Sequence, residues 1–496
     1  MPLTFYFDDF SNEVMFVHPT ETLLKDRTYT NFCKLNPNTS SYTLNKAAHR
    51  FIETRGIDRS KELNEFLIKY SGFFGINELR MSSQAFTTQY HYRKYFRDMS
   101  QQDIVAWLAI LFEYLESVIE QSRPDYIFDF DNAEVARSVL WLIADKHDIP
   151  YITIEHSRYD GYIIPSLSMG RKTDSYHCKG LQETFVSSQS LMKVEHFRGK
   201  AKIANPDFAH NKTLKMSNNT LLKDIVRLFR SVLTVAMKHY AGCRSLLNYK
   251  NFPFIANPYF GYKFHIELFF RERYLLSRAN TYFKDIKPHE KYVYFPLHVI
   301  PESSTSIKAP FIQNEEELIF AISKVLPIGY TLYLKEHGGM VGERPLKFYK
   351  RLSRLPNVKF IRLDVHNDPK DWIVNSCGVI TISGTSAFEA VMLGKKALIF
   401  GSVPYENIKG ITQSTFASLG QDILHLLDEG FDNIESCAKY VTYVTNVGQK
   451  VDFTRIHNKA YKILLECNES TAFRNEFKPI ADFFRKAISI ANDKIQ

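Results

Sequence analysis

Short apolar runs alternate with amphipathic segments through the second half of the chain. The runs hold four or five residues rich in Val, Ile, Leu, Tyr and Phe, which is typical of strands buried on both faces. The expected strands are Tyr292–Phe295, Thr331–Lys335, Val358–Ile361, Val379–Ser383 and Ala397–Phe400. Between them, apolar residues recur at helical spacing, and the expected helices cover 313–325, 345–355, 369–376 and 386–393. Strands that alternate with helices predict a doubly wound α/β domain with a parallel sheet.

A shorter version of the same pattern lies in the first half. Two apolar runs, Tyr126–Phe130 and Tyr151–Glu155, flank a segment with helical periodicity. The apolar face of that segment carries Val135, Val139, Leu142 and Ile143. A strand, a helix and a strand in this order form a crossover, which joins parallel strands. The first half therefore also predicts an α/β domain.

The length of the chain, 496 residues, exceeds what a single hydrophobic core usually supports. We therefore expect two Rossmann-like doubly wound domains that face a cleft, with an additional basic helical segment. The predicted boundaries are 1–210 for the N-terminal domain, 211–288 for the basic segment, 289–465 for the C-terminal domain and 466–496 for a terminal helix.

The segment between the two domains is strongly basic. Residues 211–284 hold 13 Lys and Arg against three acids, an excess of 13 − 3 = 10, which is about the net charge of the whole chain, +9. One helical face there carries Leu222, Ile225, Phe229, Val232 and Ala236, while Lys223, Arg227, Arg230 and Lys238 lie largely outside it. Two interpretations stay open: a helix that binds a membrane surface or an acceptor, and an ordinary helix that packs its apolar face on one of the domains.

The composition indicates where the protein is located and which kinds of partner it binds. A membrane-spanning helix would need a run of about 18 apolar residues, which the sequence does not contain. Asp8 and Asp9 interrupt the apolar core that a signal peptide would need. We therefore expect a cytoplasmic protein that is soluble or peripheral on the inner membrane. Six scattered cysteines without a CxxC pair indicate reduced thiols and no metal cluster. The basic charge suits an anionic partner, and a nucleic acid is the least favoured one because no DNA- or RNA-binding module is recognisable.

Candidate chemistry is sought where the strands end, because ligands of open parallel sheets bind beyond the carboxyl ends. After the fourth strand of the second half, Ser383, Gly384, Thr385 and Ser386 form a turn of small residues at a helix start, a favourable place for a phosphate. Glu389 follows, either as a ligand of a ribose or as the partner of Ser386 in a capping box.

Three other strand ends carry titratable residues. Lys335 and His337 follow the second strand of the C-terminal half, and His298 and Glu302 follow the first. In the N-terminal half, the strand that ends near residue 155 leads into Glu155, His156 and Arg158. Each position suits a charge-neutralising cation or a general acid, base or nucleophile. From composition alone, a structural or solvated side chain is the more common interpretation of such residues.

The order of these motifs resembles a known family, the bacterial glycosyltransferases of capsule and surface-polysaccharide biosynthesis. The motifs are PLHVIPESSTS, LYLKEHGG, LPNVKFI and TISGTSAFEAVMLGKKALIFG, with RPDYIFDF and IPYITIEHSR in the first half. The resemblance covers 124–170 and 290–405, and the group includes capsule Kdo transferases. It implies a GT-B-like fold in which the C-terminal domain binds a nucleotide-sugar.

The resemblance also implies roles for single residues. The nucleotide phosphate and ribose contacts of the family fall on Ser383, Thr385, Ser386 and Glu389, beside Gly384 and Lys335. Gly338 stands where the family usually has proline after its lysine, glutamate and histidine. Glu302 stands in the loop where Kdo transferases carry an aspartate, which leaves the donor sugar and the stereochemistry open.

Our first hypothesis is a glycosyltransferase that moves a sugar from a nucleotide-sugar, with a CMP-linked sugar as one option, to a growing capsular or lipid-linked glycan. Glu302, His337 and Glu155 are the candidate catalytic residues, and His156 and Arg158 lie on the acceptor side. No cofactor and no metal are expected. The alternatives are a polyol-phosphate transferase, a nucleotide-sugar 2-epimerase, and a non-catalytic partner in polysaccharide assembly or export.

Overall fold

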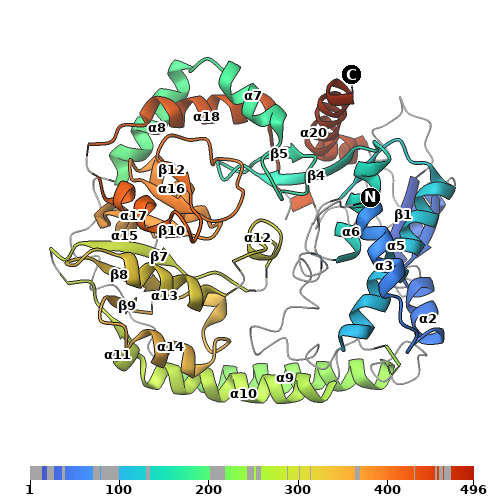
Figure 1. Cartoon of the computed structure of the whole chain (residues 1–496), viewed down its shortest axis with the longest axis horizontal. Coiled ribbons are helices and arrows are strands. Elements are labelled where there is room, and N and C mark those ends of the chain that lie inside the picture. Colours follow the sequence, from blue (N-terminus) through green and yellow to red (C-terminus); the bar gives the residue numbers. More distant parts are fainter. Residues whose placement is uncertain are drawn as a thin grey trace. The chain divides into compact units, whose positions relative to one another are not determined.

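The computed structural model of the chain is shown in Figure 1. It describes residues 14–18, 27–35, 39–70, 79, 100–129, 135–201, 218–242, 251–252, 258–287, 289–300, 302–312, 314–363, 369–428, 430–452, 455–456, 462 and 471–495. The chain divides into two compact units. The first unit comprises Met1–Leu79, Met99–Met169 and Tyr443–Gln496, and the second comprises Arg80–Asp98 and Gly170–Thr442.

The second unit is built on a seven-stranded sheet whose neighbouring strands are all parallel. Its order is β12-β11-β10-β7-β8-β9-β6. The strands are β6 (Phe283–Lys284), β7 (Tyr292–Pro296), β8 (Thr331–Lys335), β9 (Val358–Ile361), β10 (Gly378–Thr381), β11 (Ala397–Ile399) and β12 (Ile411–Gln413). The five predicted strands are confirmed. The two edge strands β6 and β12 have only two and three residues, too few to show a pattern in the sequence.

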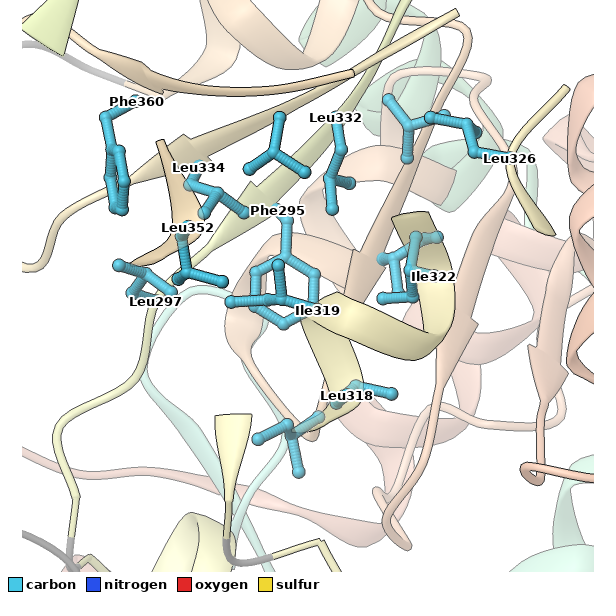
Figure 2. Packing of buried hydrophobic residues seen from close by; sticks show 14 of the residues in the cluster. Phe295, Leu297, Leu318, Ile319, Ile322, Leu326, Leu332, Leu334, Leu352 and Phe360 are labelled. Carbon is cyan, nitrogen blue, oxygen red and sulfur yellow. The ribbon is translucent and has the colours of Figure 1, made fainter. Parts of the chain in front are cut away.

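Alternate side chains of these strands face two helical layers. Val293 and Phe295 of β7 point into a core with Leu332 and Leu334 of β8, and this core is closed by three helices. These helices are α13 (Glu315–Val325), α14 (Leu346–Leu352) and α17 (Leu419–Leu427). Figure 2 shows Leu318, Ile319 and Ile322 of α13 in this core beside Phe295.

The intervening strand residues face α15 (Lys370–Asn375) and α16 (Thr385–Met392) on the other side of the sheet. Tyr294 stacks on Trp372 of α15 with ring centroids 6.4 Å apart, and the Tyr292 hydroxyl donates to the Trp372 carbonyl over 2.7 Å. Helices on both faces make this unit the doubly wound domain that the sequence predicts.

Further helices complete the second unit. They are α7 (Ser175–Glu183), α8 (Ser188–Ala201), α9 (Asn218–Gly242), α10 (Pro258–Ser277), α11 (Ala279–Tyr282), α12 (Ser303–Ser306), the 3₁₀ turn η5 (Gly338–Met340) and α18 (Ile434–Val447), which runs on into the first unit. None of the described helices combines the length and the apolar character that crossing a membrane requires.

The first unit contains two smaller sheets. One is the parallel pair β1 (Val14–His18) and β2 (Thr39–Thr43). The other has the order β13-β5-β4-β3, formed by β3 (Ile127–Phe128), β4 (Tyr151–His156), β5 (Tyr162–Ser166) and β13 (Gln449–Lys450). Around them lie α1 (Arg27–Leu35), α2 (Asn45–Glu53), α3 (Ser60–Tyr70), α5 (Gln101–Ser122), α6 (Val135–Lys146) and α20 (Thr471–Ile495).

The predicted strand, helix and strand are present in the first unit as β3, α6 and β4, with parallel pairing. The next strand, β5, runs antiparallel to β4, so this sheet is mixed. The reason is the tight turn between them, where Arg158, Asp160 and Gly161 have φ of 66°, 44° and 74° and reverse the chain at once.

The C-terminal helix belongs to the same unit. Phe483, Phe484 and Ile488 of α20 pack in one buried cluster with Ile152 of β4 and Ile163 of β5. This burial makes the first unit discontinuous in sequence, so the two units do not follow the consecutive boundaries at 210, 288 and 465.

Candidate functional site

The sheet of the second unit changes direction between β7 and β10. From β7 the chain moves outward through β8 and β9, and it then returns to the other side of β7 as β10 and continues to β11 and β12. Ligands of open α/β sheets bind beyond the carboxyl ends of the strands at such a switch point. The loops that follow β7 and β10 border it, and their described residues are 297–300, 302–306 and 382–384.

A chain of hydrogen bonds joins these two loops. The Gly384 N–H donates to Thr381 Oγ1 over 3.1 Å, Thr381 Oγ1 lies 3.0 Å from His298 Nε2, and His298 Nδ1 lies 3.1 Å from Glu315 Oε1. A carboxylate only accepts hydrogen bonds, so Nδ1 of His298 donates to Glu315, and Nε2 faces the Thr381 hydroxyl. Thr381 and Glu315 are fully buried, which shields this chain from water.

Gly384 is required by the space around it. A Cβ at this position would lie 2.6 Å from Thr381 Oγ1 and 3.1 Å from His298 Nε2. Its φ of −76° is open to any residue, so the reason for glycine is packing.

A buried ionic cluster around Arg344 contacts the β7 loop and stabilises it. The fully buried Arg344 pairs with Glu315 over 2.7 Å and with Glu336 over 3.0 Å, and it also donates to the carbonyl of His298. Tyr349 donates to Glu336 over 2.6 Å. Burial alone would raise the pKa of Glu315, but Arg344 and His298 outweigh it, and the pKa is lowered. Glu315 is thus a carboxylate that fixes the orientation of His298.

The turn after β10 leads directly into α16. Gly384 is the N-cap residue and no side chain caps the helix, so Thr385 and Ser386 are its first two residues. The capping-box interpretation of Ser386 and Glu389 is therefore wrong. Thr385, Ser386 and Glu389 are partly buried, and the buried Ser383 donates its hydroxyl to the carbonyl of Ser304 in the β7 loop.

Both ends of α16 are fixed in place. At its start, the Tyr405 hydroxyl donates to the Gly384 carbonyl over 2.9 Å. At its end, Arg198 of α8 donates to the carbonyls of Met392 and Val391, where a cation also offsets the negative end of the helix dipole. The turn is therefore held as a rigid element.

At the end of β8, Lys335 and His337 make contacts of different kinds. Lys335 Nζ lies 3.9 Å from the centroid of the Trp372 ring, a cation–π contact on the α15 side of the sheet. The exposed His337 caps η5, because its Nδ1 accepts the Gly339 N–H over 3.1 Å. Glu336 between them is buried in the ionic cluster, a role that the sequence did not reveal.

Glu302 lies in the β7 loop at the start of α12. Its side chain is exposed and accepts the Ser304 hydroxyl over 2.9 Å, while its carbonyl accepts the Thr305 and Ser306 N–H groups. Ser306 Oγ is buried and has no hydrogen-bond partner among the described residues. The structure thus brings Glu302 and the turn of α16 to two loops that are in contact through Ser383 and Ser304.

The remaining candidates lie in the first unit. Glu155 is 8% exposed on β4, His156 is the exposed last residue of that strand, and Arg158 is exposed in the turn that follows. In that turn, Asp160 pairs with Lys450 over 2.8 Å.

Sequence reasoning missed Thr381, Glu315 and Arg344. Asn314 caps α13, and this residue with the run of acids after it is the sequence signal that could have placed Glu315 at a helix start. No local signal pairs Glu315 with Arg344, because their contact is purely tertiary.

No family model and no curated protein matches the sequence. Two KpsC structures from Thermosulfurimonas dismutans align with it. The beta Kdo 2,7 transferase is 10% identical in sequence; the alignment covers 76% of this chain and 95% of that chain, with a TM-score of 0.31. The beta Kdo 2,4 transferase is 13% identical; the alignment covers 68% of this chain and 86% of that chain, with a TM-score of 0.33. UDP-GlcNAc 2-epimerase from Methanocaldococcus jannaschii, in complex with UDP-GlcNAc and UDP, is 12% identical over 69% and 81%, with 0.28. Capsule Kdo transferases are thus among the structural neighbours of this α/β chain, and these values do not assign an activity.

Proposed function

We propose that this protein is a glycosyltransferase that moves a sugar from a nucleotide-sugar to a growing capsular or surface glycan. The observation that supports it most is the switch point between β7 and β10, where Thr381 joins the start of α16 to the loop of His298 through hydrogen bonds. This is the place at which a parallel sheet binds a nucleotide.

The start of α16 suits the phosphate of the donor. The first N–H groups of a helix have no partner inside it and carry the positive end of the dipole. Thr385 and Ser386 add hydroxyls in this first turn. Because Arg198 and Tyr405 hold the helix at both ends, the site is pre-organised and needs little ordering when the phosphate binds.

Two further groups complete the proposed donor site. Glu389 lies one turn into α16 and suits the hydroxyls of a ribose. Lys335 is the last residue of β8, the neighbour of β7, and His337 lies just after it; they suit the phosphate charge and the leaving group. His337 keeps Nε2 for this purpose, since Nδ1 is used in the cap of η5.

In the reaction, the bond between the anomeric carbon and the phosphate oxygen breaks, and a hydroxyl of the acceptor forms the new bond to that carbon. A carboxylate, Glu302 or Glu155, takes the proton of the hydroxyl, and the nucleotide leaves with its phosphate charge offset by α16 and Lys335. His156 and Arg158 are assigned to the acceptor.

Thermal shift against CMP, CDP, UMP, UDP, GDP and ADP tests the donor site, since a ligand of the folded state raises its melting temperature. The variant is Thr385→Ala/Ser386→Ala, and Ser353→Ala at the exposed end of α14 is the control. We expect one nucleotide to stabilise the wild type and the control but not the double variant. A response to no nucleotide would overturn the proposal.

The product separates transfer from its alternatives. A transferase releases nucleotide only when an acceptor is present, beyond slow hydrolysis, and leaves the sugar of the unused donor unchanged. Epimerisation of the donor without an acceptor identifies a 2-epimerase, and transfer of a phosphorylated polyol identifies a polyol-phosphate transferase. If nucleotide binds but no donor is turned over, the non-catalytic interpretation holds.

A further inference from the structure

The helices α9 and α10 form an antiparallel pair in the second unit. Figure 1 shows them side by side, and two ion pairs set their register. Arg227 of α9 pairs with Glu272 of α10 over 2.6 Å, and Arg273 of α10 pairs with Asp224 of α9 over 3.3 Å. We call this pair of helices the hairpin.

One side of α10 is buried and the other is not. Phe264 and Leu275 are buried, and Leu275 belongs to the core beneath the sheet. On the opposite side of the helix, Ile266, Phe270 and Tyr274 are 44%, 64% and 45% exposed. This outer stripe of α10 therefore points away from the core of the unit.

A second exposed stripe runs along α9. Asp224, which pairs with Arg273, marks the side that contacts α10, and the half-buried Leu228 and Val235 share that side by helical spacing. Leu222 and Phe229, on the face predicted from the sequence, are 70% and 68% exposed. The stripe also includes Ile225, Val226, Leu233, Met237 and Tyr240. These side chains therefore do not pack into the core of the second unit.

The two stripes share one side of the hairpin. At about 3.6 residues per turn, Ile225 and Phe229 are rotated about the axis of α9 by roughly a quarter to a third of a turn from the side that contacts α10. Ile266 and Phe270 lie at a similar angle from the line of contact with α9. In an antiparallel pair, stripes that are rotated by the same angle from the contact between the helices lie on the same side of the pair. The two stripes therefore form one apolar surface of aromatic and aliphatic side chains.

The charge of the hairpin favours an anionic ligand. The three acids of residues 211–284 are all used in ion pairs: Asp224 and Glu272 as above, and Glu267 with Lys263 over 3.8 Å. Lys223 and Arg230 are exposed and form no ion pair with a described residue. Together with Arg227 they line a groove of about 500 Å³ along α9, beside Leu222 and Val226.

We propose that the hairpin docks the protein on an anionic lipid bilayer. Its exposed Phe, Tyr, Leu and Ile side chains would enter the interface between headgroups and acyl chains, and the neighbouring cations would meet the lipid phosphates, which is the arrangement of helices that lie in a membrane surface. A second copy of the chain is less suited to this face, since it would bring an equal excess of positive charge against it.

Flotation with vesicles tests the proposal on the full chain. The vesicles are phosphatidylcholine, either alone or with about 30% phosphatidylglycerol, at about 0.05 M and 0.5 M salt. We expect the protein to float with the anionic vesicles at low salt, with at least about tenfold less binding to neutral vesicles or at high salt. No flotation at low salt, or equal flotation with both vesicles, would overturn the proposal.

Two variants locate the surface. Phe229→Ser/Phe270→Ser and Lys223→Glu/Arg230→Glu alter exposed side chains and should each lower binding about tenfold with an unchanged melting temperature. Phe185→Ser, which is 92% exposed, and Lys347→Glu/Lys350→Glu on α14 are the matched controls and should bind as the wild type does. Equal losses in variants and controls would overturn the proposal. So would light scattering that shows a dimer abolished by Phe229→Ser/Phe270→Ser while flotation persists.

Discussion

His298 Nε2 lies 3.0 Å from the hydroxyl oxygen of Thr381, and this contact joins the loop after β7 to the end of β10 at the switch point of the sheet. The contact is buried, and Glu315 on the far side of the ring holds the imidazole in place. These buried contacts therefore support the start of α16 at the switch point.

Gly384→Ala tests how tightly Gly384 packs against Thr381 and His298. The new methyl group would lie 2.6 Å from Thr381 Oγ1, so we expect a loss of about 1–3 kcal/mol in the free energy of unfolding, together with loss of the nucleotide response. Denaturant titration and thermal shift measure the two effects. Gly420→Ala in α17 is the control, since its nearest neighbour lies 4.0 Å away and alanine should be neutral or stabilising. Equal stability of both variants would contradict the packing argument.

Arg344→Met should be among the most damaging substitutions in the second unit. It leaves the buried carboxylates of Glu315 and Glu336 without their cation, and breaking a buried pair in this way costs about 3–5 kcal/mol. Asp482→Asn removes one partner of an exposed pair in α20 and should cost under about 1 kcal/mol. Melting temperatures of the two variants check this contrast, and similar losses would show that the cluster is not a stabilising anchor.

The sequence predicted the centre of the second unit better than its edges. The bounds of β8 and β9 coincide with their predicted ranges, because strands buried on both faces are continuous apolar runs. The short edge strands gave no such signal. In the first unit, β5 was missed although its turn contains Asp160–Gly161, a dipeptide typical of hairpins, with both residues at positive φ.

The candidate site was predicted in the same uneven way. Strand-end reasoning pointed to the turn at Gly384 and to the loop of Glu302, because the rule that ligands bind at strand ends needs only the positions of the strands. It did not find Arg344, whose contacts with Glu315 and Glu336 depend on how three loops fold together. Tertiary ion pairs of this kind have no sequence period.

The stability of the sheet should depend on Glu290 and on pH. Burial opposes its ionisation, but hydrogen bonds from Lys359, Tyr333 and Thr331 prevail and lower its pKa from 4.5 to about 2. A carboxyl whose pKa is lowered in the folded state stabilises it above the unfolded pKa, and this contribution is lost as the pH falls from about 4.5 towards 2. Glu290→Gln should therefore cost about 1–3 kcal/mol at pH 7 and progressively less below pH 4.5. A difference between variant and wild type that does not change with pH would contradict this assignment.

Transfer should not need a divalent metal. The phosphate charge in the proposed site is met by the start of α16 and by Lys335, which serve the purpose that a metal serves elsewhere. We expect activity with the donor identified by thermal shift to be unchanged by EDTA. Activity that is lost with EDTA and restored by Mg²⁺ or Mn²⁺ would contradict this expectation, whereas Lys335→Met should reduce it regardless of metal.

His337→Asn separates the structural role of this residue from its chemical one. Asparagine is a good N-cap and can accept the Gly339 N–H as His337 Nδ1 does, so the free energy of unfolding should stay within about 0.5 kcal/mol of the wild type. Asparagine cannot donate a proton to the leaving nucleotide, so turnover with a bound donor should fall by about 10²-fold or more. Because the cap is kept, the Kd for the nucleotide should change much less than the rate. Wild-type turnover by His337→Asn would leave His337 only its part in the turn.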